Sequence, residues 1–327
     1  HKISVSKDDN IEIFYSDDPY CVTADESDQA VSVMAANDEI SYAYGNTKDK
    51  LLASYSGETW DYEYSFDVIG LARAGSLTQA QKDAFYKKIS SQLQNRSSSS
   101  ISDKDSSDNS KTIIALTAIG KNASNVDGYN MLEPLANFSY LTAQGVNGPL
   151  WALIAFDSGN YTIPAAKSTG QQVTRDRLVN YLINSQHNDG GWAYSGSSDI
   201  DMTAMIIQGL APYYKSNANA RAAVDRGLAW LSSHQNSKGC FTTGTVSSES
   251  QSQVIVALTS LGINPETDAR FVKNGKNAVD ALLSFYVAGG GYKHVSENWK
   301  ANGLATTQGN YALTALYRYR NGANGLY

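Results

Sequence analysis

The sequence predicts an all-α fold, a closed α/α toroid of six helical hairpins, preceded by a short N-terminal appendage. Three observations lead to this prediction: a repeat of about 50 residues in the second half of the chain, an apolar helix after each repeat turn, and similar helix pairs upstream. Of the 327 residues, 42% are hydrophobic and 18% are charged. That composition is typical of a folded globular protein and excludes a wholly disordered chain.

The repeat is a turn in which a glutamine, a glycine and an aromatic residue keep a fixed spacing. The first copy is Gln186, Gly190 and Trp192, the second is Gln235, Gly239 and Phe241, and a degenerate third has Tyr286, Gly290 and Tyr292. The aromatic positions lie 49 and 51 residues apart, and such a period is the signature of a repeat architecture. We predict that these turn residues are structural, with the aromatic ring filling the space between units.

Each turn is preceded by an amphipathic helix and followed by an apolar one. Residues 173–185 place Leu178, Tyr181 and Leu182 on one side and charged residues on the other. The segments after the turns, 203–210, 251–258 and 306–313, are apolar on more than one face, as expected for a helix buried between neighbours. Each unit therefore consists of an outer amphipathic helix, a turn and an inner buried helix.

The same pairing is predicted upstream, with inner helices at 62–75, 110–120 and 148–159 and outer helices at 48–55, 78–93 and 129–141. Gly75 and Gly120 are stop signals for two of the inner helices. The serine-rich segment 95–110 is too polar to pack and is predicted to be a surface loop. The last helix lacks the polar face that caps an open solenoid, so we predict that the six pairs close into a ring.

Residues 1–45 lack the repeat and are predicted to form an appendage to a toroid domain at 46–327. Residues 1–61 carry thirteen acidic and four basic side chains, which is typical of a solvated segment, and the alternation at 2–15 is compatible with a short strand or two. Cys21 and Cys240 either form one disulfide or stay as two buried thiols. We expect no signal peptide and no membrane span, and the net charge of −6 argues against a nucleic-acid partner.

The Gln-x3-Gly-x-Trp turn resembles the repeat of the α/α toroids in terpene cyclases and protein prenyltransferases. The resemblance covers residues 46–320 and is strongest, in segments 147–161, 186–205 and 252–276, to toroid modules of Gram-positive bacterial surface proteins. The vitamin B12 carriers intrinsic factor and transcobalamin share this toroid. The resemblance implies a secreted or cell-wall-associated module that is joined to other domains of a larger surface protein.

The motifs of the enzymatic relatives are incomplete. Terpene cyclases of class II protonate an alkene with the middle Asp of an Asp-x-Asp-Asp motif; here Asp201 is present and Met202 replaces the last Asp. The Asp-x-Cys zinc site of prenyltransferases has Lys238 in the Asp position, and a cation there repels Zn²⁺. The Gly-Cys-Gly-Glu-Gln thioester motif does not occur. We therefore expect no catalytic residue of these kinds, no metal and no cofactor.

Two points stay open at this stage. Asp201 lies near a helix start, where the macrodipole favours its charged form, but Glu249 on the adjacent inner helix is a candidate for the missing acidic partner. A lyase with a Tyr/His/Asn/Arg constellation is not excluded, because tyrosine is abundant. His187, His234 and His294 are expected to be separate surface or turn residues without a ligand.

Polar residues gather at the starts of the predicted inner helices, which meet at one mouth of the ring. They are Asp199, Asp201, Thr203, Glu249, Gln251, Gln253, Thr306 and Gln308, and Trp151 and Tyr311 add aromatic walls. This mixture is typical of a small-molecule pocket, although Asp199 and Asp201 also suit helix capping.

The sequence thus predicts a non-catalytic extracellular module that binds a small molecule or surface ligand through the central funnel. A glycan lyase or hydrolase on the same scaffold and a structural spacer in an adhesin are the alternatives.

Overall fold

The computed structural model describes residues 2–4, 12–14, 26–55 and 60–327, with side chains from residue 39 onward. The chain divides into two compact units, residues 1–41 and 42–327. In the first unit, strands β1 (Lys2–Ser4) and β2 (Glu12–Phe14) pair antiparallel with Ile3 opposite Ile13. Helix α1 (Glu26–Ala53) begins in the first unit and ends in the second.

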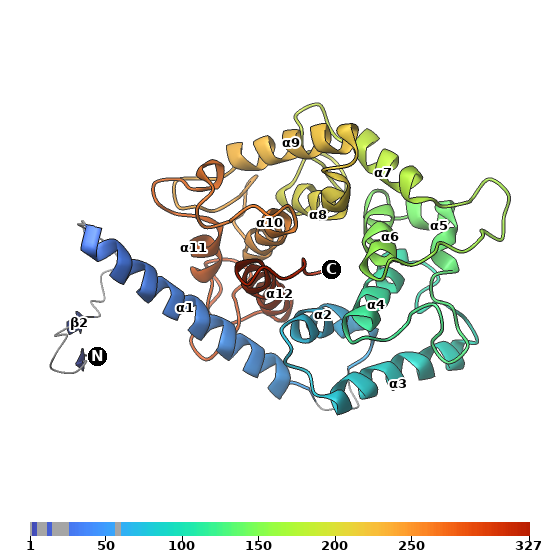
Figure 1. The fold of residues 1–327 in the computed structure, drawn as a ribbon, viewed down its shortest axis with the longest axis horizontal. Helices are drawn as coiled ribbons and strands as arrows, with labels where there is room; N and C mark the ends of the chain where they lie inside the picture. The colour runs from blue at the N-terminus through green and yellow to red at the C-terminus, as the bar shows by residue number, and fades with distance from the viewer. Residues whose placement is uncertain (1, 5–11, 15–25, 56–59) are drawn as a thin grey trace. The chain divides into compact units, whose positions relative to one another are not determined.

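The second unit is a ring of paired helices (Figure 1). The inner helices are α2 (Ser65–Arg73), α4 (Ser106–Ala118), α6 (Asn147–Ser158), α8 (Ile200–Leu210), α10 (Ser248–Ser260) and α12 (Gly303–Arg320). The outer ones are α1, α3 (Gln79–Arg96), α5 (Phe138–Thr142), α7 (Arg175–Asn184), α9 (Ala218–Ser233) and α11 (Ala278–Leu283). Short 3₁₀ helices occur at Tyr62–Tyr64, Pro134–Ala136, Ala211–Tyr213 and Ala269–Phe271. The predicted all-α toroid of six helix pairs is confirmed.

The ring is closed, because the first helices of the second unit contact the last one. The hydroxyls of Tyr44 and Thr314 are 3.0 Å apart, and the ring of Tyr44 stacks on that of Tyr317 at 4.6 Å. Between the inner helices α2 and α12, Thr307 Oγ1 donates a hydrogen bond of 2.6 Å to Asp67 Oδ1. No open end of the ring remains to be capped.

The glycine of the repeat turn lies against the backbone of the next unit. Gly190 and Gly239 have φ angles of 95° and 81°, in the left-handed region that favours glycine. A Cβ at Gly190 would lie 3.0 Å from the carbonyl oxygen of Arg226, and one at Gly239 would lie 2.6 Å from that of Asn277. The sequence therefore needs glycine here for two reasons, the turn conformation and the close approach.

The contact of a turn glycine with the backbone of the next unit is here called the joint. Its third copy, at Gly290, closes the ring. Gly290 has a φ of 99°, and a Cβ there would lie 2.5 Å from the carbonyl oxygen of Asn46 in α1. The ammonium of Lys50 donates to the Gly290 carbonyl at 2.9 Å, and the amide of Gly291 donates to Thr47 Oγ1 at 3.3 Å. The last unit thus meets the first through the same glycine contact, with Lys50 in place of the glutamine that donates to the glycine carbonyl in the other two turns.

The glutamine of the turn connects two units by hydrogen bonds. Gln186 Nε2 donates to the carbonyl of Gly190 in its own turn and to that of Ala223 in α9, both at 2.8 Å. Gln235 Nε2 repeats this with Gly239 at 3.0 Å and Phe271 at 2.8 Å. The pairing explains why this position carries a long amide side chain.

The turn aromatics are fully buried, as the structural interpretation predicts. Trp192, Phe241 and Tyr292 each have no exposed surface. The indole Nε1 of Trp192 donates to the carbonyl of Leu182 in α7 at 2.8 Å, and a Cβ at Gly227 in α9 would meet the indole ring at 2.7 Å. Trp192 therefore packs between two outer helices.

The serine-rich segment differs from the prediction. Only residues 97–105 form a loop, whereas Ser106, Ser107, Asn109 and Ser110 lie in the first turns of α4 and are buried. Their polar groups have partners: Ser110 Oγ donates to the Ser106 carbonyl at 2.8 Å, and Ser106 Oγ donates to Gln144 Oε1 at 2.9 Å. Polar residues pack here because they are hydrogen-bonded, which composition does not reveal.

Two helix predictions are also wrong in extent. The outer helix expected at 129–141 is a 3₁₀ turn, Pro134–Ala136, followed by the short α5; Pro134 lacks the amide hydrogen that a helix interior requires. The outer helix expected at 48–55 begins at Glu26, so the expected boundary between residues 45 and 46 falls inside α1.

Candidate functional site

A cavity of about 320 Å³, here called the mouth cavity, lies at the starts of α8 and α10. Helix caps place its side chains. Asp199 caps α8 by accepting a hydrogen bond of 2.8 Å from the amide of Met202, and Ser247 caps α10 by accepting one of 3.2 Å from Ser250. The residues that line the cavity are Asp199, Ile200, Asp201, Thr242, Thr243, Thr245, Ser247, Ser250 and His294.

Asp201 is the most unusual residue of the mouth cavity. Burial raises the pKa of its carboxyl to about 6, a hydrogen bond from Ser250 lowers it, and the charges of Asp199 and Glu249 raise it further. Its Oδ1 is buried and has no hydrogen-bond partner among the residues that the structure describes. The expectation that the helix start favours the charged form is therefore wrong, because desolvation outweighs the macrodipole.

Glu249 and His294 lie beside Asp201 and form a cluster of ionisable side chains with it. Glu249 is only 6% exposed, and its carboxylate oxygens lie 2.9 and 3.0 Å from Nδ1 of His294. Ser248 Oγ donates to Glu249 Oε2 at 3.2 Å. Glu249 thus lies next to Asp201 on the neighbouring inner helix. This is the position expected of the acidic partner that the Asp-x-Asp-Asp motif lacks here.

His294 is the cavity residue that sequence reasoning missed. It was expected to be a separate turn residue, yet its side chain is half exposed, lines the mouth cavity and pairs with Glu249. The signal was its position two residues after Tyr292, the aromatic residue of the third turn. After this turn the chain runs back toward the start of α10.

Three of the predicted ligand residues hold the repeat turns. Thr203 Oγ1 accepts the amide of Trp192 at 2.9 Å, and Gln251 Oε1 accepts that of Phe241 at 2.8 Å. Thr306 Oγ1 accepts the amide of the third turn aromatic at 3.1 Å. All three are buried and are not among the lining residues of the mouth cavity. This repeated contact fixes each turn on the inner helix that follows it.

Four more of the predicted ligand residues lie inside the ring: Gln253, Gln308, Trp151 and Tyr311. Gln253 Nε2 donates to Gln308 Oε1 at 3.0 Å and also to the hydroxyl of Tyr311. Trp151 and Tyr311 are 2% and 0% exposed.

The end of the described chain also lies inside the ring (Figure 1). The rings of Trp151 and Tyr327 meet edge to face at 6.0 Å, and Leu326 is 1% exposed. With Trp151 and Tyr311, these side chains fill part of the ring interior.

Neither a metal site nor a reactive thiol is evident in the described part of the chain. There, no group of three His, Cys, Asp or Glu residues is placed to hold a metal ion. Cys240 is buried, and burial raises the pKa of its thiol. Cys21 lies outside the described residues, so whether the two cysteines form a disulfide or stay as thiols remains a prediction. Among the described helices, none combines the length and apolarity needed to cross a membrane.

Comparison with known proteins finds the fold but no relative in sequence. No protein-family model matches the chain, and no curated protein matches it. Solved structures of the type II terpene cyclase MstE from Scytonema are similar, with 86% of this chain and 98% of that chain covered. The apo enzyme has a TM-score of 0.56 at 14% identity. A variant with the substrate geranylgeranyl dihydroxybenzoate has 0.56 at 13%, and one with the product merosterolic acid A has 0.55 at 14%.

The second unit therefore has the α/α toroid fold of type II terpene cyclases. At these identities the similarity concerns the fold alone, and the same fold carries different functions in different proteins. What this chain does has to be argued from its own residues.

Proposed function

We propose that the toroid binds a small polar ligand in the mouth cavity and that Asp201 recognises it. One observation carries the proposal: Oδ1 of Asp201 is buried beside the cavity without a hydrogen-bond partner among the described residues. An unpaired buried oxygen raises the free energy of the folded protein. A ligand that donates a hydrogen bond to Asp201 removes this cost.

The chemistry of the cavity indicates what the ligand presents. Asp199 and Asp201 line it, Glu249 lies behind His294, and no Lys or Arg is found among the described lining residues. The remaining lining groups include the hydroxyls of threonine and serine. Such a surface suits a ligand with an amine or several hydroxyl groups. An amine should bind more tightly as the pH rises through about 6, because Asp201 then loses its proton.

The proposal is tested by thermal shift and calorimetry with the amine spermidine and the polyol inositol, which are small enough for a cavity of about 320 Å³. A ligand at 100 times its Kd should stabilise the protein by about 2.7 kcal/mol. We expect stabilisation by at least one ligand, and we expect Asp201→Asn to abolish it. Asp176→Asn, a change at an exposed carboxylate of α7, is the matched control. Binding that survives in Asp201→Asn, or no binding of any probe, would contradict the proposal.

Acid–base catalysis is a second candidate, and the raised pKa of Asp201 favours it. A carboxyl that titrates near pH 6 keeps part of its proton near neutrality and can donate it to a bound substrate. Glu249 and His294 lie beside it as further proton-carrying groups. A polar glycan suits the open cavity better than a long isoprenoid does, because buried aromatic side chains fill the ring interior.

Product analysis separates catalysis from binding. The protein is incubated with neutral oligosaccharides and with geranylgeranyl dihydroxybenzoate, the substrate named for MstE. Products that disappear in Asp201→Asn but not in Asp176→Asn would support an enzyme. Unchanged substrates would leave binding as the function.

We further propose that the chain is a secreted or cell-wall-associated module of a larger bacterial surface protein. The support is the resemblance of segments 147–161, 186–205 and 252–276 to such modules. Localisation of the full-length protein by cell fractionation tests this; recovery with the cytosol would contradict it.

A further inference from the structure

A second cavity, here called the serine-loop cavity, lies in a different part of the ring. It has a volume of about 520 Å³ and is formed by the loop after α3 and the segment around α5, whereas the mouth cavity is formed at α8 and α10. Helices α3 and α5 lie in a different part of the ring from α8 and α10 (Figure 1). Its lining residues are Ser97, Ser98, Ser99, Ser100, Asp103, Tyr129, Glu133, Pro134, Asn137, Tyr140 and Lys167. This volume lies within the range of small-molecule sites.

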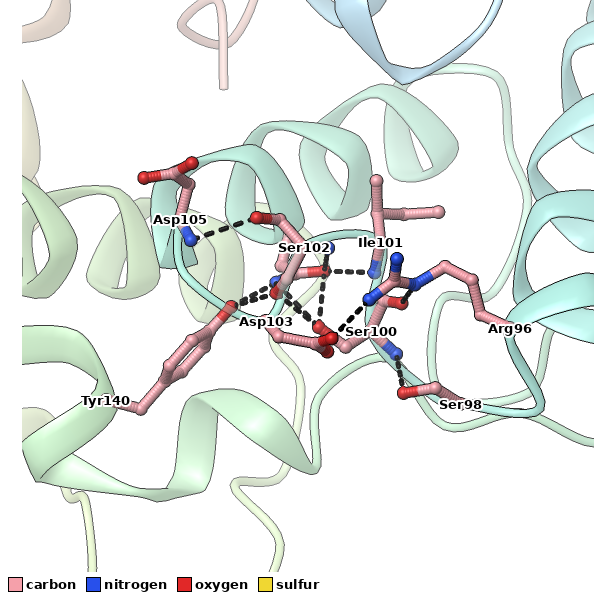
Figure 2. A network of polar contacts seen from close by, with 9 residues as sticks. Arg96, Ser98, Ser100, Ile101, Ser102, Asp103, Asp105 and Tyr140 are labelled. Carbon is pink, nitrogen blue, oxygen red and sulfur yellow. Dashed lines mark hydrogen bonds and ion pairs between the residues drawn. The ribbon is translucent and has the colours of Figure 1, made fainter.

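The serine loop is held in place by a buried asparagine. Asn109 of α4 is 0% exposed; its Oδ1 accepts the amide of Ile101 at 2.6 Å and its Nδ2 donates to the Ser102 carbonyl at 2.7 Å. Nδ2 also donates to the hydroxyl of Tyr140, which itself donates to the Ser102 carbonyl. Figure 2 shows Tyr140 reaching the loop from one side and Arg96 from the other. The loop and the Tyr140 ring are therefore positioned before any ligand arrives.

The backbone that carries the second aromatic residue of the cavity, Tyr129, is also held in place. Tyr129 ends a tight turn in which Asp127 and Gly128 have φ angles of 47° and 93°, and its backbone pairs with Val126 at 2.8 and 3.0 Å. The Asp127 carboxylate anchors the turn to α3 by accepting hydrogen bonds from Ser90 and Tyr86 at 2.5 and 2.9 Å. A rigid wall reduces the entropy lost on binding.

Each carboxylate that lines the serine-loop cavity forms an ion pair with a basic side chain. Asp103 Oδ2 lies 2.6 Å from Arg96 Nη2, and Glu133 Oε2 lies 3.0 Å from Lys167 Nζ. Each lining carboxylate thus has a cation of its own, so the cavity offers no unpaired charge to an ionic ligand. The other lining residues are uncharged: four serines, Asn137, and the rings of Tyr129, Tyr140 and Pro134.

We infer that the serine-loop cavity is a binding site for a neutral oligosaccharide. A sugar ring presents an apolar C–H face, which packs on tyrosine and proline, and a rim of hydroxyls, which exchange hydrogen bonds with hydroxyl groups that both donate and accept. The site is independent of the proposed function, because no residue that lines it lines the mouth cavity.

The test is isothermal titration with maltotetraose, cellotetraose and chitotetraose. We expect at least one of them to bind, and Tyr129→Ala to weaken binding about tenfold or more through loss of the stacking face. Ser99→Trp should block the cavity with a bulky ring. Trp299→Ala removes an aromatic side chain that is 83% exposed elsewhere and should leave affinity unchanged, as should Asp201→Asn. Melting temperatures verify that each variant is folded.

Charged probes give the other arm of the test. Trigalacturonate and the tetramer of glucosamine should bind no more tightly than the neutral sugars, because the ion pairs leave no free charge. Tighter binding of either, no binding of the three neutral sugars at millimolar concentrations, or binding that survives in both Tyr129→Ala and Ser99→Trp would overturn the inference. Loss of binding in Asp201→Asn alone would place the sugar in the mouth cavity and would overturn it as well.

Discussion

Burial disfavours the charge of several carboxyl groups in the described part of the chain, most strongly at Asp67 and Asp201. Burial raises the pKa of Asp67 and of Asp201 to about 6 in both cases. Asp67 has a partner, the hydroxyl of Thr307, whereas Asp201 keeps an unpaired oxygen at a cavity. The same physical effect therefore acts on a hydrogen-bonded carboxyl group inside the ring in one case and on a carboxyl group that lines the mouth cavity in the other.

Asp67→Asn should stabilise the protein at neutral pH. The pKa of Asp67 is higher in the folded chain, about 6, than its ordinary value of 3.8. The folded state therefore binds more protons between these values, and stability falls as the pH rises through 6. At pH 7 the cost amounts to roughly 3 kcal/mol. Urea unfolding at pH 4 and pH 7 should show a gain for the variant only at pH 7; an equal effect at both would count against the argument.

Trp192→Ala should destabilise the protein by about 3–5 kcal/mol, the usual range for a large buried aromatic. The side chain is 0% exposed and its Nε1 hydrogen bond to Leu182 is lost as well. Urea unfolding measures the effect, with Trp299→Ala, at a site that is 83% exposed, as the control. An unchanged midpoint for Trp192→Ala would mean that the repeat turn does not depend on its aromatic residue.

At the scale of the element, one joint is used repeatedly. Its parts are a left-handed glycine against the next helix pair, a glutamine that donates to two carbonyls and a polar side chain on the following inner helix that accepts the amide of the turn aromatic. The glutamine and the polar side chain satisfy backbone groups that the turn would otherwise bury unpaired, and the glycine permits the turn conformation and the close approach.

Gly239→Ala should be far more destabilising than Gly244→Ala. The first position has a φ of 81° and places a new Cβ 2.6 Å from the carbonyl oxygen of Asn277. The conformation alone costs about 1–2 kcal/mol for an L-residue, and the backbone contact adds to it. At Gly244 nothing lies within 4 Å of a new Cβ. Equal melting temperatures for the two variants would contradict the claim that the joint stabilises the ring.

The elements with a periodic signal could be predicted, and those without one could not. Gln186, Gly190 and Trp192 identify the joint because each has a geometric task that few residue types perform. The first turns of α4 escaped prediction, because Asn109 and its serine neighbours are polar in sequence and buried by hydrogen bonds to distant residues such as Tyr140. Short elements such as α5 carry too few residues for a period to show.

The candidate site was predictable only in part. Asp199 and Asp201 follow from the position of a helix start, and both line the mouth cavity. Thr203 and Gln251 look the same in sequence, but their side chains turn inward to the repeat turn. Which way a side chain points at a helix start depends on the neighbouring unit, so it could not be derived from one segment alone.

At the scale of the whole ring, closure was predictable because the last helix has no polar outer face, and the structure confirms it through Tyr44, Lys50 and Thr314. The serine-loop cavity could not be foreseen, since it depends on Asn109 holding a loop that looks featureless in sequence.

Closure also determines how the ring carries mechanical load. Helices α1 and α12 are in contact. We therefore expect a force applied between Tyr42 and Arg320 to act first on the contacts of Tyr44 and Lys50 with the last unit. The contacts between the other units should bear the force only after these have broken. We expect single-molecule stretching between these two positions to show an early rupture that shifts to lower force in Lys50→Met, followed by extension of the opened ring. Such a ring would open and lengthen when it is pulled at these two positions.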